Sequence, residues 1–280
     1  MIGDQPSRTA DRVALRRAAH QLWDSPLVFD DPLALKIIGP EGAAELARSR
    51  PAESAPERSL RAFLVARSRY AEDQLAEAVA RGVKQYVVLG AGLDTFACRN
   101  SFDGLRVFEV DHPVTQAWKR MRLKLGEVSV PSSLTFAPVD FEKETLAHGL
   151  DRAGFRADQP AFFSWLGVTP YLARETVLQT LQCIISICSR NGVAFDYVVP
   201  RSSLSPSRRR AFDDLANRVA AAGEPFVGFF DSKELVRELG KMGFAQIEGL
   251  GSRQINARYF SHRTDGLRVG GAGRLMRARG

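Results

Sequence analysis

The chain has 280 residues, of which 45% are hydrophobic and 25% are charged, and its formal net charge at pH 7 is +7. A chain of this length buries one large core, or a core together with a cap. Its sequence contains no run approaching the roughly 20 apolar residues of a membrane helix. It also begins without the apolar segment of a secretory signal. We therefore expect a cytoplasmic protein that does not bind membranes.

The cysteines and the basic charge narrow the partner classes further. Cys98, Cys183 and Cys188 are odd in number and lack metal-ligand spacing, which predicts free thiols in a reducing compartment and no metal site. Most of the positive charge is arginine, scattered along the chain instead of interleaved with aromatic residues or aligned on one helix face. This distribution predicts no nucleic-acid partner and favours attraction of small anionic substrates.

The first part of the chain has helical patterns. Residues 11–23 form one predicted helix, and Asp31 followed by proline opens another. The Gly-, Pro- and Ser-containing stretch 39–56 predicts a mobile loop. Residues 56–81 carry apolar side chains at helical spacing and predict a long amphipathic helix. We expect residues 1–82 to form a helical N-terminal cap or lid.

From residue 83 onward, short apolar runs alternate with helical segments. Each run is rich in β-branched or aromatic residues and is bounded by Gly, Pro or Asp, which is typical of buried parallel strands with crossover helices. The predicted strands are residues 85–89, 105–110, 134–139, 161–165, 193–198, 245–250 and a closing segment at 270–279. Helices at 173–189 and 232–242 fit between them. Residues 83–280 are thus expected to form one compact, doubly wound α/β unit.

A glycine loop, Gly90–Asp94, follows the first of these strands directly. Its glycines allow the backbone to approach a ligand closely, and the following helix start offers free N–H groups. Thr95 occupies the place of the third glycine in the dinucleotide fingerprint. A pyrophosphate therefore fits less well than a smaller nucleoside that carries an amino acid. A tight turn without a ligand is the alternative.

Acidic residues stand at the ends of the next two predicted strands. Glu109 and Asp111 share one strand face about 20 residues after the glycines, where doubly wound folds place a ribose-binding carboxylate. Asp111 is nearer the strand end and is preferred, with a helix N-cap before Pro113 as the alternative. Asp140 is positioned to accept from an adenine amino group while Phe141 flanks the ring, or else it forms a turn.

These motifs together resemble the leucine carboxyl methyltransferase family of class I methyltransferases, which use S-adenosylmethionine (SAM). The resemblance rests on the paired patterns Gly-Ala-Gly-x-Asp-Thr and Glu-x-Asp, and it covers nearly the whole chain. The matching segments are residues 87–99, 107–113, 139–141, 167–172, 225–244, 256–260, 29–34 and 66–70. The resemblance implies a Rossmann-like α/β sheet of seven mostly parallel strands with a helical N-terminal cap. It also implies SAM as cofactor and S-adenosylhomocysteine (SAH) as product.

Position by position, the resemblance assigns the cofactor site. Gly90 and Gly92 line SAM, and Asp111 holds the ribose. Arg67 pairs with the carboxylate of the methionine moiety, because a guanidinium binds a carboxylate through two parallel hydrogen bonds. Arg69 is the second choice for this role, and a solvated helix face is the alternative for both arginines. The complete set of expected cofactor residues is Arg67, Gly90, Ala91, Gly92, Asp94, Glu109, Asp111, Asp140 and Phe141.

The chain departs from the family after the fourth strand. The family pattern Glu-Gly-x-x-x-Tyr-Leu is here Leu166-Gly-Val-Thr-Pro-Tyr171-Leu, so Leu166 replaces the acid. Tyr171 still matches the aromatic residue that borders the substrate. For His20, packing inside the cap is the alternative to a substrate contact. The expected substrate residues are Arg17, His20, Tyr171, Arg258 and Tyr259.

The chemistry follows from the methyl donor. Transfer from a sulfonium is a displacement, and a carboxylate acceptor is already ionised at pH 7, so positioning suffices and no catalytic base is expected. We predict a SAM-dependent O-methyltransferase acting on the carboxylate of a small natural-product acid, either aromatic or polyketide. One alternative is a phenolic O-methyltransferase, which requires a base near Tyr171. Another is a SAM-binding protein without turnover, an interpretation kept open by Leu166.

Overall fold

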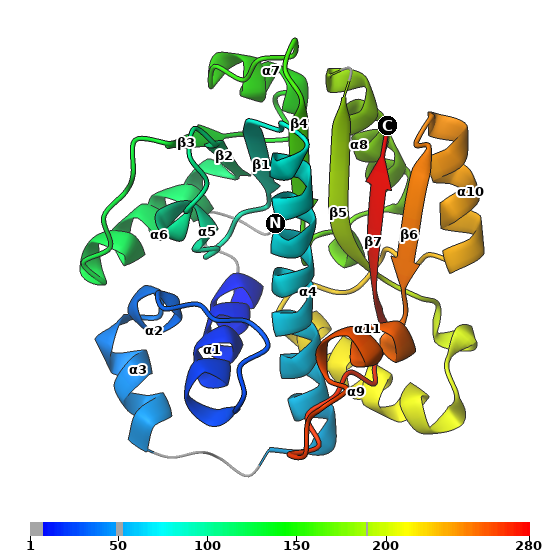
Figure 1. Cartoon of the computed structure of the whole chain (residues 1–280). Helices are drawn as coiled ribbons and strands as arrows, with labels where there is room; N and C mark the ends of the chain where they lie inside the picture. Colours follow the sequence, from blue (N-terminus) through cyan, green and yellow to red (C-terminus); the bar gives the residue numbers. More distant parts are fainter. Residues whose placement is uncertain (1–7, 49–52, 189) are drawn as a thin grey trace.

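The computed structural model describes residues 8–48, 53–188 and 190–280. A seven-stranded sheet with the order β3-β2-β1-β4-β5-β7-β6 forms its centre (Figure 1). The strands are β1 (Gln85–Leu89), β2 (Arg106–Asp111), β3 (Leu134–Pro138), β4 (Ala161–Trp165), β5 (Asn191–Val198), β6 (Gln246–Leu250) and β7 (Gly273–Arg279). Neighbouring strands pair in parallel, except that β7 runs antiparallel to both β5 and β6. The predicted mostly parallel sheet is confirmed.

The central strands are hydrophobic on both sides because helices cover both faces of the sheet. Every residue of β1, β4 and β5 is buried, as expected for strands with two covered faces. In the register, Leu89 lies opposite Val110 on one side and Trp165 on the other. The carboxyl ends of β1, β2 and β4 therefore meet at one edge of the sheet. Ligands of doubly wound folds bind at this edge.

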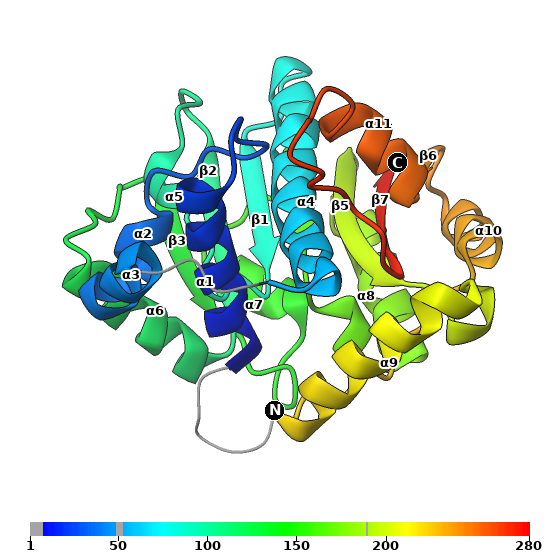
Figure 2. The same ribbon diagram turned by 90° about the horizontal axis from the view of Figure 1, so that it is seen from below.

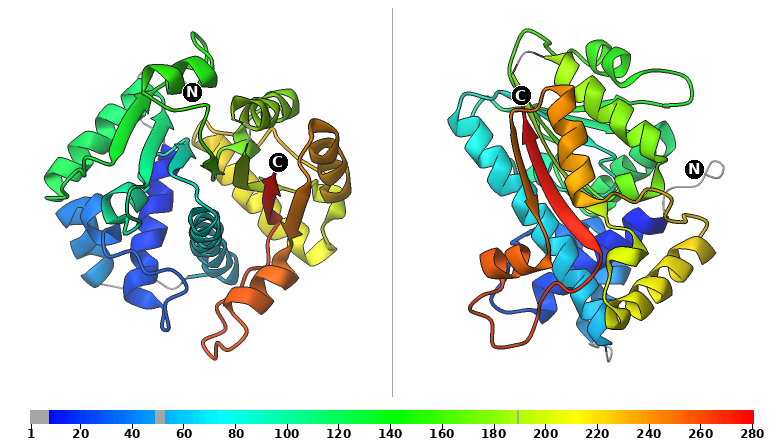
Figure 3. Two further views of the ribbon diagram at one scale, coloured as in Figure 1. Left: turned by 45° about the horizontal axis from the view of Figure 1, so that its top comes forward. Right: turned by 90° about the vertical axis from the view of Figure 1, so that its right-hand side faces the viewer.

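Helices α4 and α11 lie on one face of the sheet, and α7, α8 and α10 lie on the other (Figures 1 and 3). The helices are α1 (Arg8–Trp23), α2 (Ala34–Ile37), α3 (Gly39–Arg48), α4 (Ala55–Ala80), α5 (Phe96–Arg99), α6 (Pro113–Leu125), α7 (Leu146–Arg152), α8 (Arg174–Ile187), α9 (Pro206–Ala221), α10 (Ser232–Met242) and α11 (Ser252–Tyr259). The described part of the chain also contains the short 3₁₀ helices η1 (Thr169–Tyr171) and η2 (Arg201–Ser203). Within the described residues, no helix has the length and apolar character to cross a membrane.

Helix α4 starts with a capping box. The Ser54 hydroxyl accepts from the Glu57 backbone N–H, and the Glu57 carboxylate accepts from the Ser54 N–H, so two otherwise unpaired N–H groups are satisfied. The helix extends for 26 residues and packs directly on the sheet through buried residues such as Leu75. Helix α4, which the sequence assigns to the N-terminal cap, thus packs within the core of the sheet domain. The boundary between cap and sheet domain at residue 82 stays a prediction.

The predicted loop at residues 39–56 is largely helical. Helix α3 occupies Gly39–Arg48 and α4 begins at Ala55, while residues 49–52 lie outside the described part of the chain. Gly39 has a positive φ of 82°, and Pro40 follows in the first helical turn. Proline is tolerated there because the N–H that it lacks has no helical partner. The glycine and proline therefore mark a helix start instead of an open loop.

Candidate functional site

The glycine loop has a backbone shape that other residues adopt only with strain. Gly90 and Gly92 have φ values of +65° and +46°, in the left-handed region that favours glycine. A Cβ atom on Gly90 would lie 2.4 Å from Val168 Cγ2. The Gly90 and Ala91 N–H groups donate to the Val110 carbonyl at 2.8 and 3.2 Å, which holds the loop against the end of β2.

Asp111 lies against this loop, as its place at the end of β2 predicts. Its Oδ2 accepts from the Gly92 N–H at 2.6 Å, and its Oδ1 accepts from the His112 N–H at 2.7 Å. Burial raises the pKa of the Asp111 carboxyl, and the two N–H donors oppose that rise. The N-cap of α6 is His112, whose Nδ1 accepts from the Val114 N–H at 3.3 Å. His112, and not Asp111, therefore caps the N-terminus of α6.

Glu109 lies on the same strand face but deeper in the protein. It is 1% exposed, and the Nζ atom of Lys119 lies 2.5 Å from its Oε2. Burial raises the pKa of Glu109 to about 7, against the opposing effect of the Lys119 charge. The carboxylate is enclosed with its lysine between β2 and α6, so we do not assign Glu109 to the cofactor.

Asp140 and Phe141 follow β3 at the same edge of the sheet. The Val139 N–H donates to the Asp111 carbonyl at 2.9 Å, which ties the ends of β2 and β3 together. Asp140 accepts from the Glu142 N–H at 3.1 Å and lies 2.8 Å from Lys143 Nζ, so it forms the turn given as its alternative. Phe141 is 60% exposed. Its ring is open to stack on a planar ligand.

Of the two candidate arginines on α4, Arg67 and Arg69, only Arg67 faces the carboxyl ends of the strands. Its guanidinium is buried and pairs with Asp196 at 3.0 Å. Gly167 has a φ of +72°, and a Cβ atom on it would lie 2.7 Å from Arg67 Nη2, so the loop after β4 passes close to this arginine. Arg69 is instead exposed and bonds to Asp73 at 2.7 Å on the outer face of the helix.

Asp196 is a site residue that the sequence analysis did not select. Its Oδ1 accepts from the Gly167 N–H at 2.5 Å, while its Oδ2 pairs with Arg67. A carboxylate from β5 thus contacts the loop that begins after Leu166, where the family pattern places its own acid. Leu166 itself is partly buried and packs with the apolar side chains around α4. The sequence feature that could have indicated Asp196 is its position as the single acid in the predicted buried strand, because a buried carboxylate requires a partner.

The α1 helix is attached to the glycine loop through Arg17. Arg17 Nη2 donates to the Leu93 carbonyl at 2.9 Å and lies 3.3 Å from Asp31 Oδ2. Asp31 also accepts from the Thr95 hydroxyl at 2.7 Å. Asp94 accepts from the Phe96 N–H at 2.8 Å and closes the loop locally. Arg17 therefore positions the loop and does not line the cavity described below.

His20 does not face a substrate. Its side chain is fully buried, with Nδ1 2.8 Å from Asp24 Oδ2, and Nε2 accepts from the Val28 N–H at 3.1 Å. Both ring nitrogens are thereby occupied, and the packing alternative describes this residue.

Arg258 and Tyr259 likewise lie away from the cavity. The Tyr259 hydroxyl donates to Asp73 Oδ2 at 2.9 Å, and the Arg258 guanidinium lies 5.5 Å from the centre of the Tyr70 ring. Both residues attach α11 to the outer side of α4. The sequence could not reveal this, because the contact joins Tyr259 to Asp73, which lies 186 positions away along the chain.

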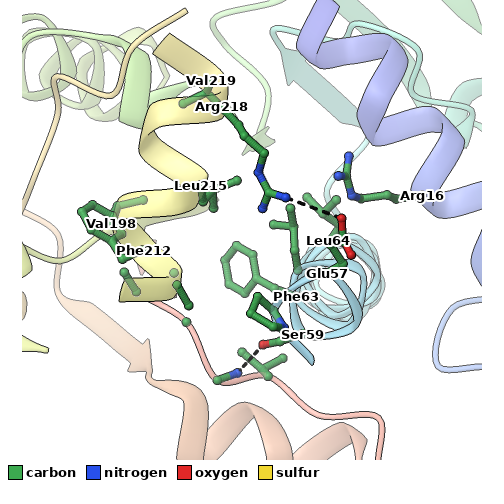
Figure 4. Close-up of a pocket in the computed structure, with 18 of the residues that line it drawn as sticks. Arg16, Glu57, Ser59, Phe63, Leu64, Val198, Phe212, Leu215, Arg218 and Val219 are labelled. Atoms are coloured by element: carbon green, nitrogen blue, oxygen red, sulfur yellow. Dashed lines mark hydrogen bonds and ion pairs between the residues drawn. The ribbon is translucent and has the colours of Figure 1, made fainter. Parts of the chain in front are cut away.

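In the ribbon view, α4 stands between α1 on one side and α9 and β7 on the other (Figure 2). A cavity of about 850 Å³ lies between α1, α4, α9 and the segment before β7 (Figure 4). At its inner end are Arg67, Gly167, Tyr171 and Asp196, next to the glycine loop because Val168 contacts Gly90. Apolar side chains form its walls: Val13, Leu60, Phe63, Leu64, Val198, Phe212, Leu215, Val219 and Phe226. This volume accommodates a drug-sized molecule.

Tyr171 is the one expected substrate residue that lines this cavity. Its ring lies 5.4 Å from that of Phe226. Burial raises the pKa of the Tyr171 hydroxyl, which is hydrogen-bonded to the Thr9 side chain. Thr9 in turn bonds to Glu224, so the first turn of α1 is held beside the cavity.

Comparison with known proteins identifies the family. A family model described as "Leucine carboxyl methyltransferase" matches residues 10–185. The chain belongs to the leucine carboxyl methyltransferase family. YktD of Bacillus subtilis (strain 168), provisionally named a SAM-dependent methyltransferase, is 32% identical over 291 residues, which cover 95% of each chain. FRAAL3718 of Frankia alni carries the same provisional name and is 35% identical over 179 residues, 62% of each chain.

Solved structures agree on the fold. A protein from Thermobifida fusca, provisionally named a methyltransferase, superposes with a TM-score of 0.59 at 15% identity, over 99% of this chain and 96% of its own. A duf574 family protein from Streptomyces avermitilis gives a TM-score of 0.59 at 14% identity, over 96% of each chain. The predicted family and the α/β fold of class I methyltransferases are confirmed.

Proposed function

We propose that this protein is a SAM-dependent O-methyltransferase that transfers the methyl group to the carboxylate of a small, largely apolar acid. The observation that carries the proposal is the apolar, arginine-rich cavity whose inner end adjoins the glycine loop. Within the family, an acceptor of natural-product type, either polyketide or aromatic, fits walls made of aromatic and branched side chains. We place the reaction in the cytoplasm, where the free Cys98, Cys183 and Cys188 remain reduced.

The residues at the carboxyl edge of the sheet fit SAM. Gly90 and Gly92 keep the loop free of side chains where it packs against Val168 and Ala10, and Asp111 offers a carboxylate to the ribose hydroxyls. Phe141 presents an exposed ring for the adenine, and the cation of Arg67 suits the carboxylate of the methionine moiety. When bound, SAM supplies an electrophilic methyl group on its sulfonium.

The ionisable groups of the cavity favour a carboxylate acceptor over a phenol. A phenol, with a pKa of about 10, requires a base, whereas a carboxylate is ionised at pH 7. Among the described lining residues, the acids are Asp196 and Glu57. Both Asp196 oxygens accept hydrogen bonds, from Arg67 and Gly167. Glu57 stands ten residues before Arg67 on α4, about 15 Å along the helix axis.

The protein's contribution is to position the acceptor and to exclude water. A Cβ atom on Gly92 would lie 3.2 Å from Ala10 Cβ, so the first turn of α1 covers the glycine loop. Arg17 and Thr9 hold that helix in place through Leu93 and Glu224. A carboxylate that is removed from water and held near the methyl group reacts faster, because alignment is achieved before the reaction.

The test uses SAM labelled in its methyl group, with a panel of aliphatic acids, aromatic acids and phenols. We expect label in an ester, which is released by mild base, and none in base-stable aryl ethers. Exclusive labelling of phenols would contradict carboxyl methylation. Tight SAM binding by calorimetry without transfer to any acceptor would favour the protein without turnover.

A further inference from the structure

The charge that lines the cavity is strongly unbalanced. Among the described residues, seven arginines contribute to its lining, whereas the acidic residues there are Glu57 and Asp196. The arginines are Arg12, Arg16, Arg58, Arg67, Arg208, Arg218 and Arg268. Arg67 pairs with Asp196, and Arg218 lies 3.5 Å from Glu57. Within the described residues, none of the other five has a carboxylate at ion-pair distance, so the cavity has a surplus of positive charge.

Two of these arginines converge at the end of the cavity remote from the glycine loop. Arg16 reaches in from α1 and Arg218 from α9, and both point to Glu57 in the first turn of α4 (Figure 4). Arg16 Nη1 donates to the Arg12 carbonyl at 3.3 Å. The Glu57 carboxylate is already shared with the N-cap, because it accepts from the Ser54 N–H at 3.0 Å and from the Ser54 hydroxyl at 2.8 Å.

Bringing the two guanidinium groups together is unfavourable without an anion. Burial lowers the pKa of Arg16, and the charge of Arg218 lowers it further, while Glu57 only partly compensates. One carboxylate therefore faces two cations in a half-buried setting. An anion between them would relieve this repulsion and accept charge-assisted hydrogen bonds from both planar groups.

We propose that Arg16 and Arg218 bind a second anionic group of the methyl acceptor, either a carboxylate or a phosphate ester. The acceptor is then an elongated molecule with an acid at each end and an apolar body between them. Its reacting carboxylate lies near Arg67 and Tyr171, and its other end lies near Glu57, a separation of about 15 Å along α4. Phe63, Leu215 and Val219 supply part of the apolar wall along the way. This inference rests on the proposed function, since it describes the acceptor of that reaction.

Binding is measured by calorimetry in the presence of SAH, so that the result does not depend on turnover. The ligands are α,ω-dicarboxylic acids of increasing chain length, monocarboxylic acids of the same lengths, and acids with a terminal phosphate. A doubly anionic ligand of matching length should bind about tenfold to hundredfold more tightly than the monoacid, as expected for hydrogen bonds between charged groups. The dicarboxylate and phosphate series together identify the preferred second group.

Three variants examine the anion site itself. Arg16→Gln and Arg218→Gln should remove the preference for doubly anionic ligands and leave monoacid binding unchanged. Glu57→Gln should strengthen binding of the doubly anionic ligand several-fold, because it removes the competing carboxylate while glutamine still supports the capping box. Arg210→Gln, at an exposed position of α9 outside the cavity lining, is the matched control and should change nothing.

The outcomes separate this inference from the proposed function. Equal binding of monoacids and doubly anionic ligands, or an unchanged preference in Arg218→Gln, would overturn the anion site even if monoacids are methylated. A preference that both arginine variants abolish would support the anion site even if no acid accepts the methyl group. In that second case only the assignment of the reaction fails. Thermal unfolding of each variant checks that the fold is retained.

Discussion

Replacing Gly90 by alanine should destabilise the protein through two separable effects. The first is backbone strain, because Gly90 has a φ of +65°. The second is a steric clash, because the new Cβ would lie 2.4 Å from Val168 Cγ2. This contact is far inside van der Waals distance, so either the loop or the valine must move.

The magnitude follows from these two terms. A left-handed backbone costs an L-residue about 1–2 kcal/mol. Forcing an extra carbon into a packed site costs about 1–3 kcal/mol. Together they lower the free energy of unfolding by about 2–5 kcal/mol, and each kcal/mol lowers the melting temperature by about 2–4 °C for a domain near this size.

The assay is urea and thermal unfolding, with Gly82→Ala as the matched control. Gly82 also has a positive φ, of 93°, but a Cβ atom added there would have no neighbouring atom within 4 Å. It should therefore show the strain alone. Gly90→Ala should also be made in a protein that already carries Val168→Ala. In that background the substitution should cost less free energy of unfolding than in the parent protein, because the clashing methyl group is gone. If Gly90→Ala costs no more than Gly82→Ala, the steric argument is refuted.

Asp111→Asn should weaken SAM binding by about tenfold or more, because one acceptor for the ribose becomes a donor; unchanged affinity by calorimetry would reject this residue as the ribose ligand. Arg67→Lys should weaken SAM binding by a similar factor, whereas Arg69→Lys should not, since only Arg67 faces the cavity. Burial raises the pKa of Glu109 to about 7, so the unfolded chain ionises first as the pH rises. The contribution of Glu109 to the free energy of unfolding should then fall as the pH rises from about 4.3 to about 7. In urea unfolding, the Glu109→Gln variant should lack this fall in stability with rising pH. If the free energy of unfolding depends on pH in the same way in the variant and the parent protein, the assignment to Glu109 is wrong.

Local patterns predict much of the fold. Helix α10 occupies Ser232–Met242, the range expected from its apolar spacing, and it ends at Gly243 with a left-handed φ of 105°. The strand before the glycine loop also lies where the sequence places it. These features depend on backbone propensities and side-chain periodicity within a short segment. Residues 39–48 form a helix where the sequence predicts a loop, because a glycine and a proline mark a helix start as well as a turn.

Side-chain roles in the candidate site are harder to predict. The sequence leaves His20 either near a substrate or packed inside the cap, and in the structure Asp24 and the Val28 N–H occupy its ring. It also places Arg258 at the cavity, but α11 directs this residue to the outer side of α4. In both cases the residue type suits the expected role. The partners that decide the role come from the packing of neighbouring elements, which no local pattern specifies.

The sequence by itself determined the strand, the glycine loop and the acid at the end of β2, because each depends on backbone geometry that a few consecutive residues control. It also determined the family, through motifs that retain this geometry. Only the tertiary structure decided which charges meet. Arginines that look scattered along the chain, such as Arg16 and Arg218, converge on Glu57 because α1, α4 and α9 enclose one cavity. Asp196 reaches Arg67 for the same reason: electrostatic interactions depend on distance in space, not on separation along the chain.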